Sequence, residues 1–374
     1  MKPRIGTLSI ERFRALRRLE IEGLGRVNLI TGRNNTGKSS VLEALRILAS
    51  DASLSVIYDI LHFREEDTRE VEESARPAKA GSLFSLSSLF HGFPQFSAEL
   101  APIVIDAIVR QRSMRLSMGA GWFSMEPQPD GSRRRVLQQD PFVVEEELLP
   151  TLVIEAGGAQ RLVPLDLLRR DTPRRLTGDI LSSERSLPCE FVSPYGGSQT
   201  ATLGPLWDKI ALSDREEDVV KALRIIDRDI VAVSMIGGEG IRQPRTAIVR
   251  SKGLPRPVNL RSFGDGLNRL FGIVLSLVNA KDGLLLIDEF ENGMHYSVQL
   301  DVWRAVFQLA RHLDVQVVAT SHSWDAVEAF QKAASEDPEE GVLIRLSRKG
   351  DDILPTLFRE DELAVATRDR IEVR

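Results

Sequence analysis

The sequence is poor in features that mark several other classes of protein. It contains one cysteine, Cys189, among 374 residues, which excludes an internal disulfide framework and a metal site built from clustered cysteines. No apolar run approaches the roughly 20 residues that a membrane-spanning helix needs. The N-terminus, MKPRIGTLSIERFR, has no apolar core of a secretory signal. We therefore predict a cytoplasmic protein without a membrane partner.

An excess of basic charge is also missing. The formal net charge is −5, and hydrophobic and charged residues make up 42% and 28% of the chain, which is typical of a globular protein of one large domain or two. Contact with nucleic acid would therefore need a local basic patch. The candidates are the run Arg133, Arg134 and Arg135 and the cluster Arg169, Arg170, Arg174 and Arg175. Such runs more often lie on a solvated surface than in a binding site. These arginines therefore leave nucleic acid as a possible partner without predicting one.

The stretch LITGRNNTGKSSVLEAL, residues 29–45, has the P-loop spacing of Gly32, Gly37, Lys38 and Ser39. Its glycines let backbone N–H groups point at phosphate oxygens. Lys38 would reach the β- and γ-phosphates of ATP, and the Ser39 hydroxyl would ligate Mg²⁺. Residues 26–30 read as a strand, and Val41, Leu42, Leu45 and Leu48 fall on one face of a helix. This strand–loop–helix context favours a phosphate site over a chance match in a solvent loop.

A second motif lies far along the chain, where residues 283–295 read GLLLIDEFENGMH. Residues 284–287 are typical of a buried parallel strand. Asp288 and Glu289 at its end would be costly without a metal or ligand. We predict that Asp288 holds Mg²⁺ together with Ser39 and that Glu289 polarises the attacking water, rather than forming a structural carboxylate pair.

Two further segments complete the pattern. A helix over 302–313 and a strand over 315–319 are followed by Thr-Ser-His, so that His322 ends a strand next to the Asp288 strand and could reach the γ-phosphate. Before Asp288, the segment RSFGDGLNRLFGIVLSL, residues 261–277, opens an amphipathic helix with a glycine-rich turn, which is another anion site. The N-terminus of the helix after the Lys38 loop already binds the phosphates there. The N-terminus of this second helix would therefore have to bind a different nucleotide.

This order of motifs resembles the ABC-type ATPase heads of the SMC, RecF and OLD (overcoming lysogenization defect) group. The opening LSIERFRALRRLEIEGLGRVNLITGRNNTGKSSVLEAL is similar to theirs, FGDGLNRL resembles their signature motif, GMHYS their D-loop, and His322 their switch histidine. The resemblance implies phosphate contact by Arg14 and by the loop residues. The nucleotide-binding set it implies is Arg14, Gly32, Asn34, Asn35, Thr36, Gly37, Lys38, Ser39 and Ser40, with Ser262, Gly264 and Gly266 from the signature segment; the catalytic set is Lys38, Glu289 and His322.

The sequence departs from that group at several positions. Gly264 stands where the signature serine is expected, with Ser262 two residues early, and Asn268 replaces the usual glutamine. Gln95 and Gln199 are weak candidates for the Q-loop glutamine. Nothing between residues 50 and 260 sustains a coiled-coil heptad, which argues against an SMC protein.

The fold class we predict is α/β, an ABC-type P-loop ATPase head with a mixed central sheet and an inserted, partly helical lobe. Residues 1–50 would form its first half, 51–204 an inserted region, and 205–374 the half with the signature helix and Asp288. Strands over 152–155 and 190–193 and a helix over 218–226 are expected within it. The segment WDKIALSDREEDVVKALRIIDRDI and the ending RDRIEVR resemble standalone OLD-like ATPases, in which the Toprim nuclease domain of the larger OLD proteins would be absent.

The resemblance implies a head-to-tail homodimer in which each ATP is closed by residues 262–268 of the facing copy. It also implies control of a separately encoded effector, most plausibly a Toprim-type nuclease, in prokaryotic antiviral defence. Three alternatives stay open: a RecF-like DNA-repair ATPase that binds DNA directly, a nucleotide-gated scaffold with little turnover, and, least favoured, a transporter subunit.

Overall fold

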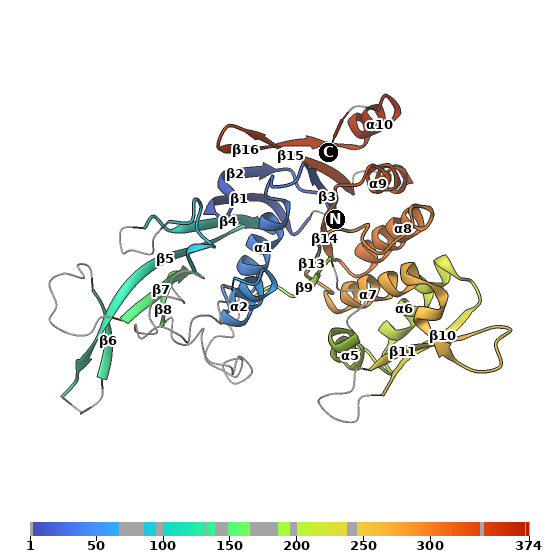
Figure 1. Cartoon of the computed structure of the whole chain (residues 1–374), viewed down its shortest axis with the longest axis horizontal. Helices are drawn as coiled ribbons and strands as arrows, with labels where there is room; N and C mark the ends of the chain where they lie inside the picture. Colours follow the sequence, from blue (N-terminus) through green and yellow to red (C-terminus); the bar gives the residue numbers. More distant parts are fainter. Residues whose placement is uncertain are drawn as a thin grey trace.

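The structure is a computed structural model of the chain. It describes residues 3–66, 86–94, 100–129, 131, 133–138, 149–164, 186–194, 200–237, 245–336, 340–370 and 372–373. Figure 1 shows a central body from which a strand-rich arm and a helical part extend on opposite sides.

The central sheet contains the predicted motif strands. Within the described ranges its order is β16-β15-β3-β14-β13-β9, parallel except for the β15–β16 hairpin. The bounds are β3 Val27–Gly32, β9 Cys189–Val192, β13 Leu284–Ile287, β14 Gln316–Thr320, β15 Gly341–Lys349 and β16 Asp352–Phe358. β3, β13 and β14 are buried along their whole lengths, as expected for parallel strands covered on both faces.

Side chains of these strands alternate between two hydrophobic cores. Leu284 and Leu286 pack with α1 (Lys38–Ala49) and α2 (Leu54–Phe63). Leu285 and Ile287 pack on the other face, with α7 (Asp265–Asn279) and α8 (Tyr296–His312). The P-loop helix and the signature helix therefore lie on opposite faces of one sheet, because successive strand residues point to opposite sides.

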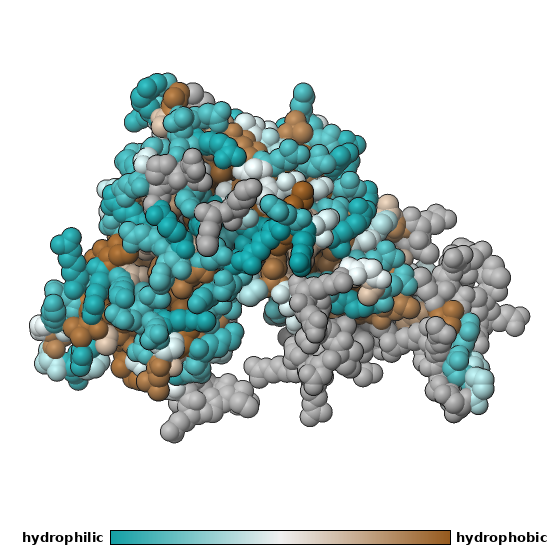
Figure 2. All heavy atoms as spheres, turned by 180° about the vertical axis from the view of Figure 1, so that it is seen from behind, coloured by the Kyte–Doolittle hydropathy of each residue, from teal (hydrophilic) through white to brown (hydrophobic). Residues whose placement is uncertain are grey.

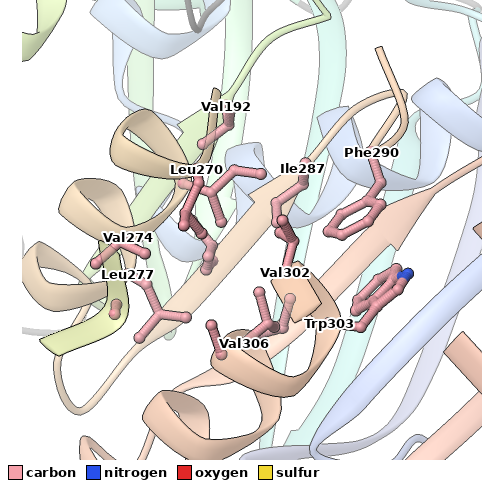
Figure 3. Close-up of a cluster of buried hydrophobic side chains, with 14 of the residues drawn as sticks. Val192, Leu270, Val274, Leu277, Ile287, Phe290, Val302, Trp303 and Val306 are labelled. Carbon is pink, nitrogen blue, oxygen red and sulfur yellow. The ribbon is translucent and has the colours of Figure 1, made fainter. Parts of the chain in front are cut away.

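The second face is covered by further helices. Figure 3 shows Leu270, Val274 and Leu277 of α7 directed toward Ile287 and Val192 on the sheet, beside the stacked rings of Phe290 and Trp303. Further helices within the described ranges are α5 Thr200–Asp208, α6 Asp214–Ile226, α9 Trp324–Glu336, α10 Glu360–Arg368 and the 3₁₀ turn η2 Leu260–Phe263. A small antiparallel sheet of β10 (Ile230–Ile236), β11 (Thr246–Ser251) and β12 (Val258–Asn259) precedes α7.

A second, antiparallel sheet begins in the central body and extends into the arm (Figure 1). Its order within the described ranges is β2-β1-β4-β5-β7-β8, with β6 also paired to β5. The bounds are β1 Ile5–Phe13, β2 Leu16–Glu22, β4 Ile103–Val109, β5 Arg112–Pro127, β6 Arg133–Gln138, β7 Leu149–Ala156 and β8 Ala159–Pro164. Apolar residues of β1, β4 and β7 share a core with α1, so the P-loop helix is packed between the two sheets.

The predicted inserted region, 51–204, is more closely integrated with the head than its expected boundaries suggest. It contributes the helix α2, but most of its described elements are strands. β4 pairs with β1 and β9 pairs with β13, so this region extends both sheets. The strands expected over 152–155 and 190–193 correspond to β7 and β9. The three-part domain division itself remains a prediction.

The described surface seen from behind is mostly hydrophilic, with scattered apolar patches (Figure 2). In the part of the chain that the structure describes, no helix has the length and apolar character needed to cross a bilayer.

A charge cluster joins the two sheets at the edge where β14 begins. The Asp314 carboxylate accepts hydrogen bonds from Arg4 (2.8 Å), Arg26 (3.0 Å) and Arg110 (3.1 Å). Arg4 and Arg26 are both almost fully buried. Partial burial opposes ionisation of the acid. Hydrogen bonding from Arg26 and the charges of Arg4, Arg26 and Arg110 outweigh it, so the pKa of Asp314 is lowered.

We expect Asp314→Asn to lower the free energy of unfolding by about 3 kcal/mol at neutral pH, because two buried guanidinium groups lose the carboxylate that they share, and each keeps one other, Asp282 for Arg4 and Glu340 for Arg26. A lowered pKa means that this stabilisation is complete above the unfolded-state pKa, about 4, and is lost as the pH falls through the folded value. Denaturant melts of both proteins from pH 7 to pH 3 measure it. Asp282→Asn is the control, since Asp282 is 61% exposed and contacts only Arg4 among these arginines; equal effects of the two substitutions would contradict the prediction.

Candidate nucleotide-binding site

The loop between β3 and α1 has the backbone that the P-loop spacing predicts. Gly32, Asn35 and Gly37 have φ values of 147°, 62° and 82°. A Cβ on Gly32 would lie 2.5 Å from the Leu346 carbonyl oxygen, and one on Gly37 would lie 2.7 Å from Leu16. Both positions therefore require glycine. Asn34 and Asn35 are exposed, whereas Thr36 and Ser40 are buried.

Lys38 begins α1 and folds back over the loop. Its Nζ donates to the carbonyl oxygens of Gly32 (2.7 Å) and Arg33 (3.1 Å). Burial lowers the pKa of Lys38, although the negative charges of Asp288, Glu289 and Glu291 act in the opposite direction. The ammonium group thus lies in the loop, in the field of three carboxylates, where phosphate oxygens could replace the two carbonyls.

The structure brings Ser39 and Asp288 together across 249 residues of sequence. The Ser39 hydroxyl donates to Asp288 Oδ1 at 3.2 Å, and the Thr320 hydroxyl donates to the same oxygen at 2.6 Å. Asp288 is buried, with 6% exposure. A serine hydroxyl next to a carboxylate, at the mouth of a phosphate loop, is a donor set that fits Mg²⁺ shared with phosphate oxygens.

The backbone of Glu289, the residue after Asp288, is strained. Its φ of 48° is unusual for a residue with a side chain. The Glu289 N–H donates to the Thr320 hydroxyl at 2.9 Å, and the Asn292 amide lies 3.5 Å from Glu289 Oε2. Strained residues held by their surroundings are common at active sites, so this turn is consistent with the predicted role of Glu289.

His322 lies just beyond the end of β14, on the rim of the same site. Its backbone N–H donates to Glu291 Oε1 at 3.0 Å, and its Nδ1 lies 3.3 Å from that oxygen. The imidazole is 55% exposed, so it can turn toward a bound γ-phosphate. That role stays a prediction.

Arg14 occupies a different environment from the one expected. Its buried guanidinium contacts Glu43 of α1 and hydrogen-bonds both carboxylate oxygens of Glu66, at 2.9 and 3.0 Å. Burial raises the pKa of Glu43, against the charges of Arg14 and Arg64. Arg14 would have to leave two carboxylates to reach a phosphate, and its nucleotide contact remains a prediction.

The signature segment is placed at the same edge of the sheet as Asp288 but on the other face from α1. Gly264 caps α7 with a φ of 100°, and both Ser262 and Gly264 are exposed. A depression of about 400 Å³ at this turn is lined by Phe263, Gly264, Gly266, Gly293 and His295, among others. It joins the signature turn to the predicted D-loop.

Some predicted residues lie outside the described part of the chain. These are the Q-loop candidates Gln95 and Gln199 and the cluster Arg169, Arg170, Arg174 and Arg175. The backbone of residues 133–135 belongs to β6.

Three residues of the site were not predicted from sequence. Thr320 links Asp288 to the Glu289 backbone, Glu291 contacts His322, and Arg269 of α7 donates to the carbonyl oxygens of Asp288 and Glu289. The one sequence signal for Arg269 is a charge on the apolar face of an amphipathic helix.

Two protein families match the chain. The family described as "AAA ATPase domain" matches residues 3–80, which contain the P-loop. The family described as "AAA domain, putative AbiEii toxin, Type IV TA system" matches residues 197–327, which contain the signature helix, Asp288 and His322. The chain is an AAA/ABC-type ATPase.

Two relatives are similar to this ATPase in sequence, and the description of the first agrees with that class. An "ATP/GTP phosphatase" of Helicobacter pylori is 23% identical over 355 residues, 89% of each chain. An uncharacterised protein of Methanocaldococcus jannaschii is 50% identical over 46 residues, 12% of this chain and 21% of that protein.

Solved structures show the fold. An SMC head bound to the C-terminal winged-helix domain of ScpA superposes with a TM-score of 0.51 at 9% identity, over 96% of this chain and 99% of that one. The SMC head domain of Thermotoga maritima has a TM-score of 0.47 at 13% identity, over 95% and 99%. The first likeness confirms the ABC-type head fold of this ATPase; OLD-like membership remains a prediction.

Proposed function

We propose that this ATPase binds ATP with Mg²⁺ at the Lys38 loop, and that ATP-dependent pairing of two copies controls a separately encoded effector. The observation that carries the proposal is the convergence of Lys38, Ser39, Asp288 and Glu289 on one face of the site, with an exposed glycine turn on the opposite sheet face. The first set can hold and hydrolyse a nucleotide. The second is an anion site that needs a nucleotide from elsewhere.

Each residue of the P-loop half has a defined task in this proposal. Lys38 exchanges the Gly32 and Arg33 carbonyls for phosphate oxygens, together with the N–H groups of residues 34–40. Ser39 and Asp288 would hold Mg²⁺, which neutralises phosphate charge when bound. Glu289 orients and polarises the attacking water, and His322, held by Glu291, turns to the γ-phosphate.

The head-to-tail dimer follows from the position of α7. Its N-terminal N–H groups and the glycines at 264 and 266 would receive the phosphates held by the facing copy. Asp265 lies in the first turn of α7, where it stabilises the helix. We propose that the backbone N–H groups of this turn make the contact.

Gly264→Arg tests the shared site. A Cβ at Gly264 has no neighbour within 4 Å, and its φ of 100° adds a strain of about 1–3 kcal/mol that a stable chain can tolerate, so the isolated chain should fold while the side chain occupies the space that a phosphate needs. We expect ATP binding to persist while turnover falls at least about 100-fold, since the closing copy supplies transition-state contacts. Gly158→Arg is the matched control, because Gly158 has a φ of 83° and equally open surroundings in the β7–β8 turn. Similar turnover of the two variants would exclude the shared site.

The effector is the finer part of the proposal. The description of one matching family names a putative toxin of a type IV toxin–antitoxin system. The SMC head of similar fold was solved in complex with a domain of another protein, ScpA. Both observations support an ATPase that regulates another protein. We propose an OLD-like role in prokaryotic antiviral defence, with a Toprim-type nuclease as the effector.

Affinity capture from the native host, with wild type and Glu289→Gln, tests the effector. We expect a nuclease that is recovered in one nucleotide state and whose DNA cleavage depends on that state. DNA cleavage by the purified ATPase alone would contradict this role. ATPase stimulation by DNA without any partner would instead favour a RecF-like clamp.

A further inference from the structure

Arg269 is a buried charge next to the catalytic turn. It lies in the second turn of α7 and is 3% exposed. One terminal nitrogen donates to the Ser193 carbonyl at 2.8 Å, and the other donates to the carbonyls of Asp288 and Glu289, each at 3.2 Å. The guanidinium thus spans the ends of β9 and β13.

Burying this guanidinium costs free energy. Among the described residues no carboxylate lies within ion-pair distance of it, and its Nε is buried without a hydrogen-bond partner. Burial lowers the pKa of Arg269 to about 10, although Glu291, Asp288 and Glu289 act to raise it. A helix that only needed to pack here would be more stable with an apolar residue. Such an exception to the rules of packing is typical of functional positions.

Arg269 also completes the clamp on the strained Glu289. The Glu289 N–H is held by Thr320 of β14, and its C=O accepts from the Asn292 N–H (3.0 Å) within the turn and from Arg269 of α7 (3.2 Å), which is the contact that reaches outside the turn. The orientation of this residue, with its φ of 48°, therefore depends on both elements. Removing either contact should let the peptide relax and move the carboxylate away from the attacking water.

The same helix begins at the signature turn. Gly264 is five residues before Arg269, about 7.5 Å along a helix axis, and apolar contacts pack α7 against the sheet (Figure 3). Because a packed helix moves as a unit, a shift at Gly264 would be felt at the Glu289 carbonyl.

We propose that Arg269 is a positioning residue for Glu289 of its own chain, through which contact between the signature turn and a second copy adjusts hydrolysis at the chain's own site. This inference rests on the proposed dimer. It makes the two sites of a dimer interdependent, since the turn that closes one site is rigidly joined to the catalytic carboxylate of the other.

Arg269→Met and Arg269→Lys should lower kcat by about 10- to 100-fold, because small displacements of a catalytic group have effects of that size. The affinity for ATP should change less than about twofold, since Arg269 does not contact the P-loop, and Lys should retain more activity than Met. The matched control is Arg224→Met: Arg224 also donates to backbone carbonyls, of Ile230 at 2.7 Å and Val231 at 3.2 Å, but in α6. Normal kcat in Arg269→Met, or an equal loss of kcat and of ATP affinity in a folded protein, would overturn the inference.

Mixing experiments separate action within a chain from action across the dimer. Arg269→Met mixed with Glu289→Gln should show no turnover above that of Arg269→Met alone, because each chain lacks part of its own catalytic turn. Gly264→Arg mixed with Glu289→Gln should regain turnover about tenfold above either variant alone, because an intact Glu289 then meets an intact signature turn. Rescue in both mixtures would place Arg269 in the trans contact and refute the inference. Absence of rescue in the Gly264→Arg mixture would refute the shared-site dimer instead.

Discussion

Lys38→Ala is expected to reduce kcat/KM for ATP by at least about 1,000-fold, a loss of about 4 kcal/mol of transition-state stabilisation. The β- and γ-phosphates would lose the one ammonium group that the loop places among them. In the structure this ammonium donates to two carbonyl oxygens, and burial lowers the pKa of Lys38. Its charge is therefore a cost until phosphate oxygens surround it.

Because the buried charge of Lys38 costs free energy, the same substitution should not destabilise the fold, although it abolishes the response to ATP. The variant without nucleotide should unfold at a temperature no lower than wild type, because a partly buried charge is removed, while the thermal shift produced by MgATP should disappear. Differential scanning fluorimetry with and without MgATP measures both effects. The control is Lys332→Ala, whose ammonium pairs with Glu328 at 2.7 Å on the surface of α9 and should leave the ATP-dependent shift intact. Normal turnover in Lys38→Ala would show that the P-loop assignment is wrong.

Glu289→Gln should separate binding from chemistry. The amide keeps the size of the side chain but removes the negative charge that polarises water, so we expect kcat to fall by about 100- to 10,000-fold. The contacts of the Glu289 backbone with Thr320 and Arg269 involve no side-chain oxygen of Glu289. The strained turn should therefore survive, and ATP should bind with wild-type affinity.

Trapped ATP should make this variant accumulate as a dimer. Size-exclusion chromatography with light scattering, with and without saturating MgATP, measures it. Glu328→Gln on α9 is the control for the loss of one carboxylate, and it should behave as wild type. A monomeric Glu289→Gln variant at saturating MgATP would contradict the shared-site proposal, but it would not contradict the ATPase assignment.

Sequence alone determined the parts of this protein whose signals are local. The strand expected over 284–287 is β13, and the strand–loop–helix around Lys38 is β3 followed by α1. Both could be predicted because short runs of buried residues, glycine positions and helical periodicity depend on neighbours in the chain. The pairing of Ser39 with Asp288 was predictable for another reason, since both residues follow parallel strands and the carboxyl ends of such strands share one edge.

Tertiary structure decided what depends on long-range packing. The pairing of β4 with β1 and of β9 with β13 joins the middle of the chain to both sheets, and no local pattern specifies which edge a strand will extend. The enclosure of Arg14 by Glu43 and Glu66, and of Arg269 by three backbone carbonyls, could not be predicted either. An arginine has the same sequence signature on a solvated surface as in a buried site; only the elements that fold over it determine its partners, and thus whether its charge stabilises the fold or positions a catalytic group.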